Sequence, residues 1–248
     1  MGEQHPGGER TLHVVMRKEE LDSARVPDKT VVVVDVLFAT TTIIAVLARG
    51  ASRVYPVRDA AEARALAARP GMHQAVLAGE TMFRFIDGFA PPTPLALRRH
   101  MAGKETLIYA TTNGTVALGT SAGARRVLVG SLINASATAN AIDGATAGTV
   151  VILCSGTAGA FNLEDFYGAG CLVDRITARD AGWRLTDAAQ AALDLFRASD
   201  AESTLRRSLV GRLMHEWGLD AEVAFAARVD ECALAGELRG DHVQACRQ

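Results

Sequence analysis

The stretch VVVVDVLFATTTIIAVLARG, residues 31–50, joins an apolar strand, a carboxylate and the start of a helix. Its valines form a β-branched run that leads to Asp35, and an apolar pattern typical of a helix follows. Between them lie Thr40, Thr41 and Thr42, a residue type that commonly caps helix N-termini. A carboxylate at the end of a buried strand is unfavourable unless it is paired or binds a cation. The stretch therefore predicts a strand–helix unit whose connection carries chemistry.

The same alternation of strand and helix patterns continues along the chain. Short β-branched runs predict strands at Val31–Val36, Arg53–Val57, Gln74–Ala78, Thr106–Ala110, Arg126–Val129 and Thr149–Leu153. Ala-rich stretches between them predict helices, for example at Ile43–Arg49, Ala60–Ala68 and Ala135–Ile142. Strands that are apolar on both faces are typical of a parallel sheet covered by helices on both sides. The pattern therefore predicts an α/β fold with a mostly parallel sheet.

The two ends of the chain differ from this pattern. Residues 1–10 are polar and glycine-rich and are expected to be disordered, which leaves residues 11–248 as a single domain. From about residue 163 the chain is expected to be mostly helical, through Asp187–Ser199, Glu202–Trp217 and Glu222–Ala235. This C-terminal part is expected to cap the sheet or to form a second subdomain.

Composition excludes several classes of function. The net charge of −2 predicts neither a nucleic-acid-binding nor a membrane-binding surface, because both need a basic face. The apolar runs are shorter than the ~20 residues of a membrane span, and the N-terminus lacks the apolar core of a signal peptide. The cysteines show no metal-binding spacing: Cys154, Cys171, Cys232 and Cys246. We expect a cytoplasmic protein with reduced thiols and a small-molecule substrate.

Polar, small and acidic residues follow the predicted strands where each one ends. Ligands of open α/β sheets bind beyond the carboxyl ends of the strands, so we expect these residues to converge at one edge. The candidates are Asp35, Thr40–Thr42, Gly79, Glu80, Thr111–Thr115, Gly130, Ser131, Asn134, Cys154–Gly159, Asn162, Glu164 and Asp165. Carboxylates together could hold a hard cation such as Mg²⁺, and hydroxyls and glycines at helix starts favour an anion. This combination suits a phosphorylated or carboxylated substrate.

Ordinary structural roles remain open for several of these residues. The threonines that follow Asp35 could serve only as helix caps. Glu164 and Asp165 are also favoured at any helix N-terminus by the helix dipole. Cys154 has no histidine partner in the sequence pattern, which favours a buried core residue over a nucleophile.

Several sequence blocks occur in the order found in a known family: DVLFATTTI, LAGE, TTNGT, GSLINA and CSGTAGAFNLEDFYGAG. In these blocks, and in the later SLVGRLMHEWGLDAEVAFAARVD, the chain resembles the 2-phosphosulfolactate phosphatase family over residues 30–231. The resemblance implies a three-layer α/β/α fold. It also implies Mg²⁺-dependent hydrolysis of the phosphate of 2-phosphosulfolactate.

The chain resembles a divergent member of this family, because several positions depart from the family pattern. Phe38 and Thr81 stand where the family pattern has arginines, and residues 88–94, GFAPPTP, replace a segment resembling Gly-Phe-Asp-x-Gly-Asn-Ser-Pro. An arginine guanidinium binds tetrahedral oxyanions through paired N–H donors, so these changes leave a more apolar entrance to the site. The apolar residues nearby in the sequence are Phe38, Met82, Phe83, Phe85 and Phe89.

Three hypotheses follow. In the first, the chain is a Mg²⁺-dependent phosphatase in which Asp35 and Glu80 bind the metal or orient water, and Glu164 and Asp165 assist. The substrate is then held by Phe38, Thr40, Thr41, Thr42, Thr112, Asn113, Gly114, Thr115, Cys154, Ser155 and Gly156. In the second, a repurposed enzyme uses the carboxylates as general acid and base on a less charged biosynthetic intermediate, in a cyclisation, isomerisation, elimination or hydrolysis. In the third, the chain only binds an anion.

The apolar stretch at residues 82–97 predicts one of two features. It is either an oligomer contact, which would make the protein a homo-oligomer, or a lid.

Overall fold

The structure is a computed structural model that describes residues 10–142 and 148–246. Its strands are β1 (Thr11–Val15), β2 (Thr30–Val34), β3 (Arg53–Val57), β4 (Val76–Thr81), β5 (Arg84–Phe85), β6 (Thr106–Ala110), β7 (Arg126–Gly130), β8 (Thr149–Cys154), β9 (Arg184–Leu185), β10 (Gly236–Arg239) and β11 (His242–Ala245). Its α-helices are α1 (Ala39–Leu47), α2 (Ala60–Ala67), α3 (Pro94–His100), α4 (Gly114–Ser121), α5 (Ala135–Ala141), α6 (Leu163–Arg179), α7 (Asp187–Ala198), α8 (Ala201–Arg207), α9 (Leu209–Glu216) and α10 (Asp220–Ala226).

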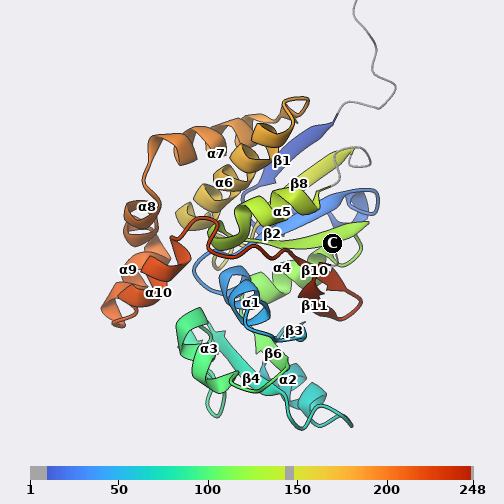
Figure 1. The fold of residues 1–248 in the computed structure, drawn as a ribbon, viewed down its shortest axis with the longest axis vertical. Coiled ribbons are helices and arrows are strands. Elements are labelled where there is room, and N and C mark those ends of the chain that lie inside the picture. The colour runs from blue at the N-terminus through green and yellow to red at the C-terminus, as the bar shows by residue number, and fades with distance from the viewer. Residues whose placement is uncertain (1–9, 143–147, 247–248) are drawn as a thin grey trace, which may run out of the picture.

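The strands form one mixed sheet in the order β5-β4-β6-β3-β11-β10-β7-β2-β8-β1-β9 (Figure 1). Strands β7, β2, β8 and β1 pair in parallel, as do β3, β6 and β4. The antiparallel hairpin β10–β11 joins these two groups of parallel strands. The predicted α/β fold with a mostly parallel sheet is therefore confirmed.

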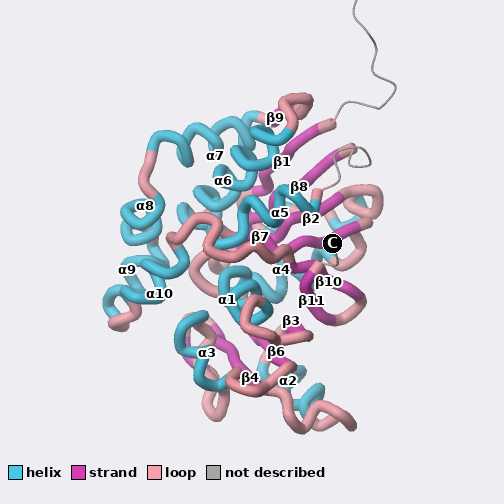
Figure 2. The backbone as a smooth tube through the Cα atoms, in the orientation of Figure 1, coloured by secondary structure: helices cyan, strands magenta, loops and turns pink. Residues whose placement is uncertain are grey.

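The valine run of β2 packs against helices on both faces of the sheet. Val32 and Val34 pack into a core cluster with α5, α6 and α7, whereas Val31 and Val33 pack into a second cluster with α1 and α4. All four side chains are fully buried because helices cover both faces of the sheet at this strand (Figure 2). A strand covered on both faces needs no polar alternation, which is why the sequence shows four consecutive valines. The three-layer α/β/α arrangement is confirmed.

The C-terminal part departs from the expected helices in two places. The stretch expected as one helix over Glu202–Trp217 is divided into α8 and α9 at Ser208, whose hydroxyl accepts a hydrogen bond from the Gly211 amide at 3.0 Å. The last expected helix ends at Ala226 instead of Ala235. The chain then runs to the hairpin β10–β11, which the sequence did not predict.

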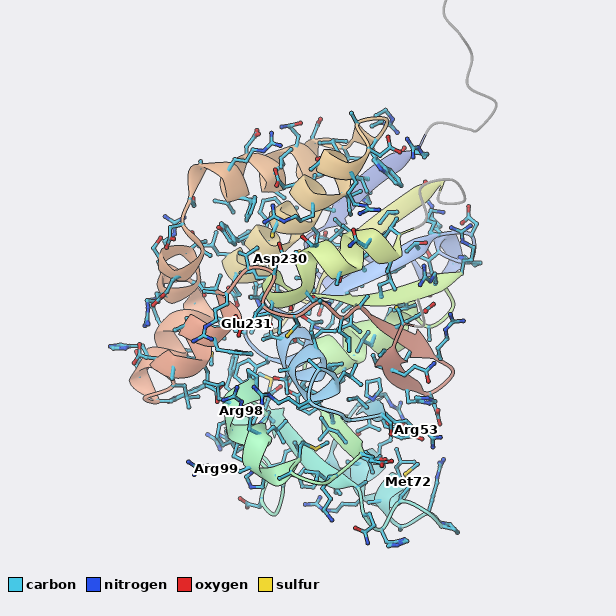
Figure 3. All side chains as sticks on the ribbon, in the orientation of Figure 1. Arg53, Met72, Arg98, Arg99, Asp230 and Glu231 are labelled. Atoms are coloured by element: carbon cyan, nitrogen blue, oxygen red, sulfur yellow. The ribbon has the colours of Figure 1, made fainter. Side chains whose placement is uncertain are left out.

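Tertiary contacts hold the segment between α10 and β10 in a non-helical conformation. The amides of Asp230 and Cys232 donate to the carbonyls of Leu132 and Ile133. The Asp230 carboxylate accepts from the Ser136 amide at 2.6 Å and from the Arg175 guanidinium at 3.0 Å. Figure 3 labels Asp230 on this segment, beside α5 and α6.

Strand β1 and the short strand β9 were also not predicted. The expected disordered start lies outside the described residues except for Arg10, and the division into one domain or two subdomains stays a prediction. Across residues 10–142 and 148–246, no helix combines the length and apolarity needed to cross a membrane.

Candidate active site

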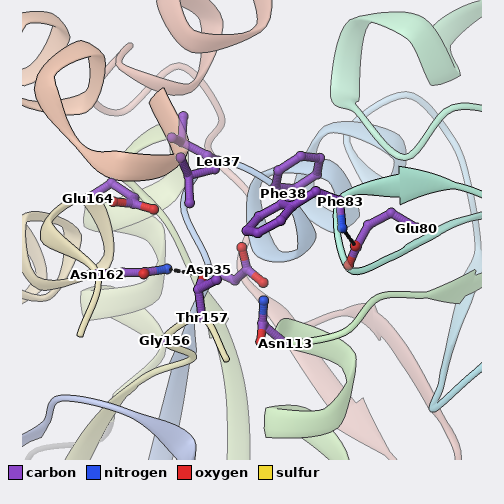
Figure 4. A pocket seen from close by; sticks show the side chains of 11 residues that line it. Asp35, Leu37, Phe38, Glu80, Phe83, Asn113, Gly156, Thr157, Asn162 and Glu164 are labelled. Carbon is purple, nitrogen blue, oxygen red and sulfur yellow. Dashed lines mark hydrogen bonds between the residues drawn. The ribbon is translucent and has the colours of Figure 1, made fainter. Parts of the chain in front are cut away.

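A small pocket lies at the carboxyl ends of the parallel strands, between the two groups of strands (Figure 4). It is lined by Asp35, Leu37, Phe38, Glu80, Phe83, Asn113, Gly156, Thr157, Asn162, Glu164 and Val210. These residues come from the end of β4, from the loops that follow β2, β4, β6 and β8, and from helices α6 and α9. The cavity volume is about 10 Å³, which is close to the space that one water molecule needs. The structure thus brings together candidates that are more than a hundred residues apart in the sequence.

Asp35 follows β2 directly, and its side chain is aimed into the pocket (Figure 4). Its carboxylate accepts hydrogen bonds from the backbone amides of Phe38 and Ala39 at the start of α1. Gly114 begins α4 on the other side of this carboxylate. A Cβ added at Gly114 would lie 2.4 Å from Asp35 Oδ2, so only glycine allows the start of α4 to approach so closely.

Asp165 fixes the loops that follow β2 and β8. Its Oδ1 accepts from the Val36 amide at 2.9 Å, and its Oδ2 accepts from the Ser155 hydroxyl at 2.9 Å and the Gly156 amide at 3.2 Å. Gly156 has a positive φ of 64°, a backbone conformation that favours glycine. Asp165 is buried behind the pocket and holds the loops that line it.

Glu164 precedes Asp165 on α6 but has different surroundings. Its side chain lines the pocket and is 2% exposed, and its Oε2 has no hydrogen-bond partner among the described residues. A buried carboxylate oxygen without a partner is unfavourable, and each such atom in a native protein calls for a reason. Its position on the pocket wall points to a ligand as that reason.

Three of these carboxyl groups have strongly raised pKa values. Burial, and next the nearby charge of Asp165, together raise the pKa of Asp35 to about 7. Burial likewise raises the pKa of Glu164 to about 7, and burial together with the charge of Glu164 raises the pKa of Asp165 to about 7. Because the three groups titrate together near neutral pH, this cluster can accept and return protons under physiological conditions.

Glu80 lies across the pocket on β4 and is fully engaged in hydrogen bonds. Its Oε1 accepts from the Thr112 amide at 2.6 Å, and its Oε2 accepts from the Phe83 amide at 2.8 Å and the Thr112 hydroxyl at 3.2 Å. Thr112 in turn accepts from the Met82 amide at 2.8 Å. Glu80 therefore holds the β4–β5 turn against the loop that follows β6.

Phe83 extends this turn over the pocket and packs against Trp217 at the end of α9, with ring centroids 6.1 Å apart. The neighbouring Met82 and Phe85 are 57% and 44% exposed. The interpretation of residues 82–97 as an oligomer contact or a lid stays a prediction.

Several predicted substrate-binding residues do not line the pocket. The hydroxyls of Thr40, Thr41 and Thr42 are fully buried and donate to the backbone carbonyls of Asp35, Val36 and Pro92. Thr115 donates to the carbonyl of Thr111, and Cys154 lies fully buried in the core, where burial raises its thiol pKa well above the usual range. In this conformation these residues shape the loops. A direct contact of theirs with substrate stays a prediction.

Sequence reasoning missed Leu37, Val210 and Lys18 as residues of the site. Phe83, Thr157 and Asn162 were expected near it, and they line the pocket. Thr157 and Asn162 belong to the loop after β8, and Asn162 donates to the Thr157 hydroxyl at 2.8 Å. Lys18 follows β1, and its ammonium donates to Asn113 Oδ1 at 2.9 Å and to the Ser155 carbonyl at 3.2 Å. Recognition of the short apolar alternation in β1 would have placed Lys18 at a strand end.

Comparison with known proteins identifies the family. The family model for 2-phosphosulpholactate phosphatase matches residues 15–241. The chain belongs to this family.

Curated members of the family match along nearly their whole length. A protein of Carboxydothermus hydrogenoformans named probable 2-phosphosulfolactate phosphatase is 35% identical over 219 residues, which are 88% of this chain and 89% of that protein. Proteins with the same name from Caldicellulosiruptor saccharolyticus and Clostridium acetobutylicum are 33% and 31% identical, over 86% and 94% of this chain and 90% and 99% of their own lengths. These names describe hydrolases of a phosphoric monoester, so the predicted family and enzyme class are confirmed.

The donors at the pocket are oxygen atoms, which is the chemistry that a hard cation needs. No group of three or more His, Cys, Asp or Glu side chains in the described part of the chain is arranged to hold a metal ion. Mg²⁺, however, is commonly held by one or two carboxylates, with waters and substrate phosphate completing its shell. Asp35 and the unpartnered Oε2 of Glu164 fit such a set.

Proposed function

We propose that the chain is a phosphatase that hydrolyses a small acidic phosphoester, with 2-phosphosulfolactate as the first candidate. The observation that carries this proposal is the cluster of Asp35, Glu164 and Asp165 at a pocket formed by strand-end loops. The names of the family's curated members support the same reaction.

In the proposed reaction, water attacks phosphorus, the bond from phosphorus to the ester oxygen breaks, and the leaving oxygen takes a proton. Asp35 faces the pocket and is proposed to orient the attacking water and accept its proton. The proton that Asp35 accepts then passes to the leaving oxygen, so that no proton is gained or lost overall.

Asp165 is proposed to hold the loops of the site in place. It fixes the Val36 amide and the Ser155–Gly156 backbone, so that the loops on both sides of Asp35 keep their spacing.

We propose Mg²⁺ as the cofactor, held by Asp35 and Glu164. When bound, the cation would neutralise the phosphoryl oxygens and the carboxylates. Glu80, the other ligand predicted from the sequence, uses both carboxylate oxygens to accept hydrogen bonds from Thr112 and Phe83. Its proposed role is therefore to hold the wall of the pocket.

Substrate entry requires a movement of the pocket wall. The cavity has room for about one water molecule, and a phosphoryl group is larger. Phe38, Phe83 and Val210 lie on the apolar side of the lining. We propose that the β4–β5 turn, which carries Phe83, moves away to admit the ester.

The test is phosphate release from a panel of phosphoesters that includes 2-phosphosulfolactate. We expect release with Mg²⁺, loss of release with a chelator, and recovery when Mg²⁺ is restored. Release that persists in the presence of chelator would contradict the metal assignment. Absence of release from every ester would contradict the proposed function.

A second candidate is acid–base catalysis on a less charged intermediate. It is favoured by the pocket lining, which has no lysine or arginine among its described residues and which includes Phe38 in place of the family arginine. Phe38→Arg discriminates between the candidates, because a guanidinium would bind a multiply charged phosphoester. Increased turnover of 2-phosphosulfolactate by this variant would favour the phosphatase, and an unchanged rate would favour the second candidate.

A further inference from the structure

Lys18 connects two loops of the site without lining the pocket itself. Its ammonium donates to Asn113 Oδ1 at 2.9 Å in the loop after β6 and to the Ser155 carbonyl at 3.2 Å in the loop after β8. It also pairs with the Glu19 carboxylate at 3.0 Å, and the Lys18 side chain is only 10% exposed. An ammonium has three donors, so these contacts occupy all of them. Lys18 is therefore held in one place beside the site.

The contact with Lys18 decides which way the Asn113 amide faces. A lysine ammonium can only donate, so the atom of Asn113 that faces it must be the carbonyl oxygen. The amide nitrogen then faces away from Lys18, into the pocket. Figure 4 shows this nitrogen turned toward the Asp35 carboxylate. Among the described residues, the only hydrogen bond of the Asn113 side chain is the one that its oxygen accepts from Lys18, so the amide protons remain available to a ligand.

The surroundings make a neutral donor useful at this point. Asp35, Glu80 and Glu164 line the pocket and would repel an anionic ester, and no lysine or arginine of the described chain lines it. A cationic side chain at the position of Asn113 would pair with Asp35. An oriented amide instead offers N–H groups to a phosphoryl oxygen and leaves Asp35 free.

We propose that Lys18 is a positioning residue that locks the Asn113 amide as a hydrogen-bond donor to an anionic oxygen of the substrate. This inference rests on the proposed phosphatase function. It assigns a role to a residue that lies within the family match at residues 15–241 but outside the sequence blocks quoted above. It also assigns the loop after β1 to the site. Strands β6 and β8 are not neighbours in the sheet, so Lys18 ties together loops that the sheet itself does not join.

The first test compares Lys18→Met with a matched control. Lys104 donates to the Gln74 amide oxygen at 2.9 Å in an exposed location, so Lys104→Met removes the same type of contact away from the site. We expect Lys18→Met to lower kcat/KM for the phosphoester about tenfold, mainly through KM, because a lost hydrogen bond to a charged group has about this effect. Lys104→Met should leave kcat/KM unchanged. Lys18→Arg keeps a donor-only group and should retain most of the activity.

A double-variant cycle separates positioning from a direct charge effect. If Lys18 acts through Asn113, the combination of Lys18→Met with Asn113→Ala should be no slower than Asn113→Ala alone. If the two losses multiply instead, Lys18 acts by another route and the inference is overturned.

A spectroscopic readout keeps the inference testable if no phosphoester is turned over. The side-chain amide peaks of Asn113 in a ¹H–¹⁵N spectrum are assigned by their absence in Asn113→Ala. We expect these peaks to move in Lys18→Met and to stay in place in Lys104→Met. Peaks that stay in place in Lys18→Met would overturn the inference, whereas absence of turnover with moving peaks would contradict only the proposed function.

Discussion

The two sides of the pocket differ in how their carboxylates are held. On one side, Glu80 accepts hydrogen bonds on both oxygens, two of them from backbone amides. On the other side, Asp35 and Glu164 face the cavity beside the buried Asp165, and all three have pKa values raised to about 7. Glu164 even lacks a partner for one oxygen among the described residues.

The difference teaches that burial alone does not mark a catalytic carboxylate. A buried acid whose oxygens are fully hydrogen-bonded holds neighbouring loops in place, whereas one that is buried and underbonded is poised to bind a cation, substrate or proton. Glu164 and Asp165 make the same contrast between adjacent residues of α6.

Removal of the Asp35 charge should produce the largest change in activity. We expect Asp35→Asn to reduce phosphoester turnover about a thousandfold or more, since it removes the carboxylate that is proposed to accept the proton of the attacking water. The melting temperature should stay the same or rise, because one of three mutually repelling acids is lost. Glu80→Gln is the control from the other side of the pocket, and it should mainly lower stability. If Glu80→Gln lost as much activity as Asp35→Asn at an unchanged melting temperature, the proposed difference between the two sides of the pocket would be contradicted.

Adjacent acids on α6 should respond in opposite ways to neutralisation. Asp165→Asn replaces an acceptor by an NH₂ group opposite the Val36 amide or opposite the donors from Ser155 and Gly156, so we expect a loss of about 2 kcal/mol in unfolding free energy. Glu164→Gln removes an unpartnered buried charge and should not destabilise the fold. Urea unfolding of both variants at pH 7.5 measures the difference, and equal destabilisation would contradict the distinction.

The carboxyl cluster should make stability depend on pH. Its pKa values are raised from 3.8 or 4.5 to about 7, so between these values the folded state holds protons that the unfolded state has lost. Stability from these groups is therefore greatest at acidic pH, falls as pH rises from about 4 to about 7, and levels off above that. In chelator-treated protein, we expect the unfolding free energy to fall by about 2 kcal/mol or more between pH 5.5 and pH 8.5. The fall should be smaller in Glu164→Gln, and a slope unaffected by this substitution would count against the assignment.

Two glycines of α4 provide the smallest and most local test. At Gly114 an added Cβ would meet Asp35 Oδ2 at 2.4 Å, whereas at Gly119 no atom lies within 4 Å. We expect Gly114→Ala to lower turnover about tenfold by displacing Asp35, and Gly119→Ala to raise stability by about 0.5–1 kcal/mol through helix propensity. Equal activity of the two variants would show that Asp35 tolerates displacement.

Much of the fold could be read from local pattern. The valines of β2 and the Ala-rich helices carry their own signal, because burial on both faces and helix propensity act within a short window. The strands β10 and β11 give only a weak pattern, since both are four residues long and β10 contains the charged residues Glu237 and Arg239. Glu237 is accommodated there by a 2.8 Å ion pair with Arg126, a contact that spans more than a hundred residues of sequence.

The sequence by itself determined the α/β class, the strand-end location of the acids, and the membership of Asp35, Glu80, Asn113, Gly156 and Glu164 in one region. Local pattern and the rule for parallel sheets are sufficient for these. Only the tertiary structure decided that the carboxylates of Glu80 and Asp165 accept hydrogen bonds while Glu164 Oε2 accepts none from the described residues. It also decided that the Lys18 ammonium donates to Asn113. These differences depend on which donors other segments bring within about 3 Å, a distance that no sequence spacing encodes.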